Sequence, residues 1–305
     1  MRGLPTASGL RRCATALLAV LAAAVSLNML WCCWCLYVGR QFRLFDYGLY
    51  TNFIWNSGRG DFFKCMVNDS YLVNHLSFSL VPLGWLYYLW DDAFLLLAVQ
   101  WLFPVLGALI LVAAGRRHRL PAELLAMLAF FFVGYRFTQQ ILAAEFHGVA
   151  LYLLLVPWLY YNLSFRKGMV WLPLLLILGV REDAFLFLQP LLLYFAVKDR
   201  WRMGYVWMAA SIGYGALAIY GLYPWLNGMS MFARRERDGS LISWEKMIAE
   251  GVFPRWGKAV VWTLLPALVA WRRGSMPAFL FPSVAFVQCV FSGIDRQQSL
   301  GIHYS

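Results

Sequence analysis

The sequence predicts an all-α protein, a polytopic bundle of transmembrane helices. Apolar residues make up 62% of the 305 positions and charged residues only 13%, whereas soluble domains carry roughly 45–50% apolar and about 25% charged residues. The net charge is +11, but the basic residues form short clusters between apolar runs, as cytoplasmic loops do. This pattern indicates a lipid bilayer as the partner and argues against nucleic acid.

The first apolar run, Cys13–Val38, follows a basic start that resembles a secretory signal. It is long enough to cross a bilayer, so we expect an uncleaved first helix. Its cysteines have no His or carboxylate at ligand spacing, and we interpret them as small buried hydrophobes. Further spans are expected at Ala93–Ala114, Leu124–Ala143, His147–Phe165, Met169–Val180, Ala184–Val197, Gly204–Tyr223, Ala259–Trp271 and Met276–Ser292.

Leu76–Trp90 is apolar but short, since about 15 residues cover roughly 22 Å of a core about 30 Å thick. If this run lies along the outer surface and the N-terminus is cytoplasmic, the short basic loops all become cytoplasmic, as the positive-inside rule favours. These loops hold Arg116/Arg117/Arg119, Arg166/Lys167, Lys198/Arg200/Arg202 and Arg272/Arg273.

The resulting prediction is a single transmembrane domain, 1–305, in the plasma (inner) membrane of a prokaryote. Residues 39–92 form a first outer segment with surface-lying helices, and residues 224–258 form a second outer loop.

Three adjacent charges interrupt the run Met169–Val197. One continuous helix would put Arg181, Glu182 and Asp183 in hydrocarbon, which costs several kcal/mol. We therefore expect two short helices that bend at this point, with the bend lining a water-filled cavity that opens outward. In this topology most other carboxylates and histidines also lie outside, among them Asp46, Asp61, Asp69, His75, Glu145, His147, Asp295 and His303.

The order of several short motifs resembles a family of prokaryotic membrane proteins named domain of unknown function 2079. The motifs are Phe45-Asp46-Tyr47-Gly48, Tyr50, Trp55-Asn56, His75-Leu76-Ser77-Phe78, Glu145-Phe146-His147-Gly148, Arg181-Glu182-Asp183, Tyr223-Pro224-Trp225 and His303-Tyr304. The family pattern has proline at Gly148 and more often lysine at Arg181. Its members continue beyond His303-Tyr304 into further helices, so this chain is expected to be a fragment.

That family in turn resembles the GT-C glycosyltransferases, which use lipid-linked sugar donors. Those enzymes have an acidic residue after the first helix, a surface-lying apolar helix before the second, and short paired helices near the outer face. Asp46, Leu76–Trp90 and the Arg181–Asp183 bend occupy the corresponding places. The resemblance implies sugar transfer from a polyprenyl-phosphate donor at the extracytoplasmic face.

Asp46, Glu182 and Asp183 are the candidate catalytic residues. Asp46 would act as a general base or hold a metal, although an acidic residue near a helix start can also be a cap. Structural pairing with Arg181 or Arg136 is the competing interpretation for Glu182 and Asp183.

The candidate substrate-binding residues are Arg136, Gln140, Arg181, His147, Glu145 and His75. Arg136, Gln140 and His147 share one face if the third span continues regularly through Ala143. For Arg136 two interpretations stay open: an ion pair with a carboxylate, or binding of a lipid phosphate.

The outer histidines and carboxylates are suitable metal ligands, but no local spacing supports a site. No metal ligand is assigned, and the cofactor is left open, with a divalent metal as one option. Two other functions stay open: a transporter or channel with a charged outward cavity, and a non-catalytic membrane protein.

Overall fold

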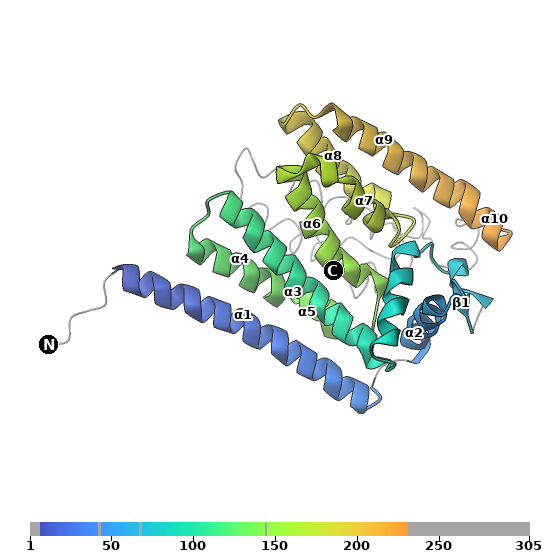
Figure 1. Ribbon diagram of the computed structural model, residues 1–305, viewed down its shortest axis with the longest axis horizontal. Coiled ribbons are helices and arrows are strands. Elements are labelled where there is room, and N and C mark those ends of the chain that lie inside the picture. The colour runs from blue at the N-terminus through green and yellow to red at the C-terminus, as the bar shows by residue number, and fades with distance from the viewer. Residues whose placement is uncertain (1–6, 42–43, 67–68, 144, 231–305) are drawn as a thin grey trace, which may run out of the picture. The chain divides into compact units, whose positions relative to one another are not determined.

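The structure is a computed structural model that describes residues 7–41, 44–66, 69–143 and 145–230 (Figure 1). These residues are almost entirely helical, which confirms the all-α prediction. The two strands among them, β1 (Lys64–Cys65) and β2 (Asp69–Ser70), form one short antiparallel hairpin. The predicted spans Ala259–Trp271 and Met276–Ser292, most of the second outer loop and His303 lie outside the described residues.

In the described part of the chain, four helical stretches are long and apolar enough to cross a membrane. The first two are α1 (Ala7–Val38) and α3 (Phe94–Arg117). The third combines the 3-10 turn η3 (Gly148–Leu151) with α6 (Tyr152–Phe165). The fourth is α9 (Arg202–Ala216), which continues through the π-helical segment η5 (Leu217–Leu222) into α10 (Tyr223–Asn227).

The chain divides into two compact units, and the first comprises residues 1–70 and 79–177. Within it α1 packs against α4 (Ala122–Gly134), and α3 packs against both α4 and α6 (Figure 1). The approach of α3 to α6 is close because Gly107 faces the carbonyl of Leu153, where a Cβ atom would clash. The Trp101 indole N–H donates to the Ser26 carbonyl at 2.7 Å and ties α3 to α1.

The predicted span Leu124–Ala143 is wrong as one regular helix. Its backbone is extended at Tyr135, with ψ 133°, which separates α4 from α5 (Arg136–Ala143). Carbonyls at a helix end need new hydrogen-bond donors. Here the Thr138 hydroxyl donates to Phe132 O at 2.9 Å, and the Gln139 amide donates to Val133 O.

The predicted first outer segment starts and ends at the same end of this unit. The Tyr37 hydroxyl, near the end of α1, donates to Asp92 Oδ1, just before α3, at 2.9 Å. Between them lie α2 (Leu44–Gly58) and the 3-10 helix η2 (Phe78–Tyr88), which contains Pro82. Most of the run Leu76–Trp90 thus forms a short 3-10 helix, and its position along the outer surface of the membrane stays a prediction.

The second unit comprises residues 71–78 and 178–305. It starts with the 3-10 turn η1 (Tyr71–Val73) and resumes where α7 (Trp171–Leu178) ends. Its described part also contains α8 (Ala184–Lys198), which packs along α9 (Figure 1).

The last described helix of this unit runs further than predicted, through Asn227 instead of Tyr223. Proline inside a regular α-helix clashes with the carbonyl four residues earlier. The wider π-helical turn before Pro224 relieves that clash, so the helix continues past it.

Candidate functional site

The charged triplet lies where the sequence predicted a bend. Helix α7 ends at Leu178 and α8 begins at Ala184, so Arg181, Glu182 and Asp183 occupy the connection between two short helices. All three residues are buried, and Glu182 is completely inaccessible, with 0% of its surface exposed. Three buried ionisable groups in five connecting residues require specific polar partners.

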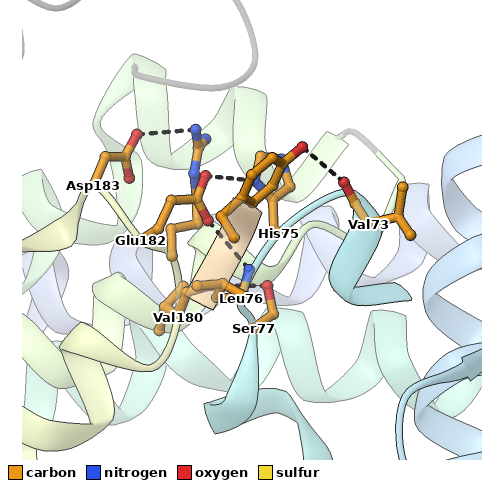
Figure 2. A network of polar contacts seen from close by, with 9 residues as sticks. Val73, His75, Leu76, Ser77, Val180, Glu182 and Asp183 are labelled. Carbon is orange, nitrogen blue, oxygen red and sulfur yellow. Dashed lines mark hydrogen bonds and ion pairs between the residues drawn. The ribbon is translucent and has the colours of Figure 1, made fainter. Parts of the chain in front are cut away.

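The partners of Glu182 come from a segment more than 100 positions earlier in the chain (Figure 2). Glu182 Oε1 lies 3.0 Å from His75 Nδ1. Glu182 Oε2 accepts a hydrogen bond from the backbone N–H of Leu76 at 3.2 Å. Both oxygens of the buried carboxylate are therefore engaged.

The same segment is held at two further points (Figure 2). The Ser77 hydroxyl donates to the Val180 carbonyl at 2.9 Å. On the other side of His75, the Tyr223 hydroxyl donates to the Val73 carbonyl at 3.0 Å. His75 thus lies between two anchored residues, and its imidazole has little freedom to leave Glu182.

Arg181 and Asp183 form a separate ion pair, with Arg181 Nη2 at 3.0 Å from Asp183 Oδ2. The two neighbouring acids consequently have different partners, Glu182 the imidazole and Asp183 the guanidinium. Burial raises the pKa of Glu182, but His75, together with Arg181, outweighs burial and holds this pKa below its ordinary value of 4.5. The ionised carboxylate is the form that the site stabilises.

A second group of predicted site residues belongs to the first unit. His147 is buried, and its backbone N–H donates to Gln100 Oε1 at 2.9 Å. The amide of Gln100 also donates to the Ile141 carbonyl at 3.0 Å, so Gln100 connects the end of α5 with the Glu145–His147 turn. The Tyr50 ring of α2 lies 6.0 Å from the His147 ring.

His147 does not share a helical face with Arg136 and Gln140, contrary to prediction. Helix α5 ends at Ala143, and His147 has an extended backbone, with φ −130° and ψ 132°. Arg136 and Gln140 do lie one turn apart on α5. The Gln140 side-chain oxygen is buried without a hydrogen-bond partner within the described residues.

Asp46 lies in the first turn of α2, one turn before Tyr50. The side chains of Asp46 and Arg136 are outside what the structure describes, so their roles stay predictions. Across the described residues, no three His, Cys, Asp or Glu side chains are grouped in a way that could hold a metal ion.

Three contributors to these sites were not singled out from the sequence as site residues. Gln100 had a usable signal, because it is a polar residue inside a long apolar span. Tyr223 was noted as part of a motif, without a role. The backbone N–H of Leu76 had no signal, because any residue type supplies one.

Residues 40–305 match the family described as Predicted membrane protein (DUF2079). The chain belongs to the DUF2079 family. The match contains every candidate site residue, from Asp46 to Asp183, and it supports residence in a lipid bilayer. No curated protein and no solved structure matches this DUF2079 chain. The further resemblance to GT-C glycosyltransferases therefore stays a prediction.

Proposed function

We propose that this DUF2079 protein is a membrane glycosyltransferase that moves a sugar from a polyprenyl-phosphate donor to an acceptor at the extracytoplasmic face. The observation that supports it most is the buried Arg181-Glu182-Asp183 connection between two short apolar helices. Ionisable groups beside apolar spans are expensive and mark functional sites in membrane proteins. A lipid-linked phosphate combines an anion with an apolar chain, which suits a charged cluster beside such helices.

The guanidinium group is planar and well shaped for phosphate oxygens, so Arg181 and Arg136 are the proposed donor-phosphate contacts. Gln140, Glu145 and His147 shape the substrate pocket. Asp46 is the general base or the holder of a divalent metal, and Asp183 keeps Arg181 oriented through their ion pair. The N-terminus is cytoplasmic, and the site faces outward from the plasma membrane.

Donor binding can be tested before the sugar is known. The purified full chain in detergent is photo-crosslinked to a diazirine analogue of undecaprenyl phosphate, with unlabelled undecaprenyl phosphate as competitor. The variants are Arg136→Ala and Arg181→Ala, with Arg202→Ala, an exposed arginine at the start of α9, as the matched control.

We expect labelling that the competitor removes, that falls several-fold in Arg136→Ala and Arg181→Ala, and that is unchanged in Arg202→Ala. Absence of competed labelling in folded protein would overturn the proposal, and so would equal loss in all three variants. Asp46→Asn should bind the probe normally yet fail in sugar transfer. If the probe does not label the protein, but lipid vesicles containing the protein take up a solute, a transporter would be favoured instead.

A further inference from the structure

The His75–Glu182 contact has the geometry of an oriented carboxylate–imidazole dyad (Figure 2). The carboxylate is inaccessible, whereas 32% of the His75 side chain is exposed. One end of the imidazole therefore faces a buried anion, and the ring itself is reachable from outside the protein core.

The tautomer of His75 follows from this arrangement. An ionised carboxylate only accepts hydrogen bonds, so Nδ1 must carry the proton that lies between the two groups. In neutral imidazole the other nitrogen, Nε2, then has the free lone pair. Within the described residues, Nε2 makes no hydrogen bond. The ring is thus set to accept a proton at Nε2.

Resting on the proposed glycosyl transfer, we infer that His75 is a catalytic residue, with Nε2 accepting the proton of the acceptor hydroxyl, and that Glu182 is its positioning residue. The hydroxyl oxygen forms a bond to the anomeric carbon of the sugar. The bond from that carbon to the donor phosphate breaks, and its electron pair leaves with polyprenyl phosphate. The hydroxyl proton moves to His75 Nε2, which leaves Asp46 the second of its two proposed roles, that of holding a divalent metal.

Glu182 is poorly suited to take that proton itself. Both of its oxygens accept hydrogen bonds, and none of its surface is exposed. Its pKa is held below the ordinary value by His75 and Arg181, which makes it a weak base. A buried carboxylate of this kind holds an imidazole in one tautomer and stabilises the imidazolium once the proton arrives.

The surrounding contacts fix the ring, as proton transfer requires. His75 is flanked by Val73, whose carbonyl accepts a hydrogen bond from Tyr223, and by Ser77, whose hydroxyl donates to the Val180 carbonyl.

Other titratable groups also lie around the His75–Glu182 pair. Arg181 and Asp183 belong to the same connection as Glu182. The α9–α10 helix contributes Tyr223, which bonds to Val73, and Tyr214, which interacts electrostatically with Glu182.

The test uses the full chain with undecaprenyl-phosphate hexoses as donors and measures sugar transfer to a hydroxyl acceptor from pH 5 to pH 9. Photolabelling by the undecaprenyl phosphate analogue is measured in parallel. The variants are His75→Gln and Glu182→Gln, and the control is His118→Gln, an exposed histidine that follows α3.

We expect kcat to fall about 10²–10⁴-fold in His75→Gln, with photolabelling within about twofold of wild type and His118→Gln unchanged. Added imidazole should restore part of the rate in His75→Gly. In Glu182→Gln we expect a smaller loss of kcat and an acidic limb of the pH–rate profile that moves relative to wild type. A purely structural role for Glu182 would lower the yield of active protein without moving that limb.

Turnover by folded His75→Gln within twofold of wild type would overturn the role of His75 and leave the transferase proposal intact. Wild-type protein that neither binds the probe nor transfers any hexose would overturn both. Wild-type protein that binds the probe without turnover would contradict the catalytic role of His75.

Discussion

The Leu76 backbone N–H donates to Glu182 Oε2 at 3.2 Å, across 106 positions of sequence. Because the donor belongs to the backbone, every residue type except proline can supply it at position 76. The carboxylate is consequently placed by the path of the 71–78 segment, and the adjacent His75 ring meets its other oxygen. Two segments distant in sequence thus depend on one side chain for their joint geometry.

Loss of one partner from the Arg181–Asp183 ion pair should destabilise the protein strongly. Both side chains are about nine-tenths buried, and breaking such a pair costs roughly 3–5 kcal/mol because a buried charge loses its counter-charge. We expect a clear fall in apparent melting temperature for Asp183→Asn, measured in detergent. The control Asp199→Asn removes an exposed acid just after the other end of α8 and should have little effect.

The double variant Arg181→Met/Asp183→Leu supplies a further check. Apolar residues of similar size avoid the uncompensated charge, so it should be more stable than Asp183→Asn alone. A double variant less stable than Asp183→Asn would show that the pair's charges have another structural role.

Acid should remove the stabilisation that Glu182 provides. The pKa of Glu182 is lower in the folded protein than its ordinary value of 4.5, because His75 and Arg181 favour the ionised form more than burial opposes it. In acid the unfolded chain binds this proton first, so stability from Glu182 is complete above about pH 5 and declines as pH falls below 4.5.

Thermal unfolding of wild type and Glu182→Gln from pH 7 to pH 3 measures this effect. The difference in melting temperature should be largest at neutral pH and narrow in acid. A difference that stays constant over the whole range would contradict the assigned pKa direction.

Two glycines of α9 should respond in opposite ways to alanine. A Cβ atom at Gly215 would clash with the ring of Phe185 on α8, whereas a Cβ at Gly213 meets nothing within 4 Å. Gly215→Ala should therefore cost about 1–3 kcal/mol through overpacking, and Gly213→Ala should be neutral or gain up to about 1 kcal/mol of helix propensity. The measurement is thermal stability of each variant in detergent.

Phe185→Leu in the Gly215→Ala background should recover part of the loss. Equal effects of the two alanine substitutions would mean that α8 and α9 are not packed as closely as described.

The sidedness predicted from the basic loops can be measured directly. In a background without native cysteines, Asp61→Cys in the first outer segment should react with a membrane-impermeant maleimide in intact cells. Arg119→Cys, in the loop between α3 and α4, should react only after permeabilisation. Both positions are exposed in the structure. The reverse pattern would place the N-terminus outside and exclude the proposed outward site.

The bend at Arg181–Asp183 and the short η2 helix could be predicted because each follows from a local rule. Charges are excluded from hydrocarbon, and a run of about 15 residues is too short to cross it. Both rules depend on the properties of the membrane, so they can be applied without knowing the tertiary contacts between helices.

The break at Tyr135 could not be predicted in the same way. No proline marks the break at Gly134-Tyr135 in the sequence. The break depends on the side chains of Thr138 and Gln139, which donate hydrogen bonds to the freed carbonyls of Phe132 and Val133. The pairing of His75 with Glu182 was equally hidden, because each residue has other plausible partners in the sequence. The expected partners of Glu182 were Arg181 and Arg136, whereas its closest contacts are His75 and Leu76.

The π-helical segment Leu217–Leu222 has a consequence for changes in chain length. After Gly204, the buried positions of this helix are Ser211, Gly215, Ala218 and Tyr223, which follow one another at steps of four, three and five residues. The last step is one residue longer than a regular turn, and the π-helix absorbs it without rotating Tyr223 away from Val73. Deletion of one residue there would leave an ordinary α-turn with Tyr223 on the same side. The same deletion in the preceding turns would rotate everything after it by about 100° relative to Gly204. The π-helical segment is therefore a place where this helix can lose one residue and keep its inward face.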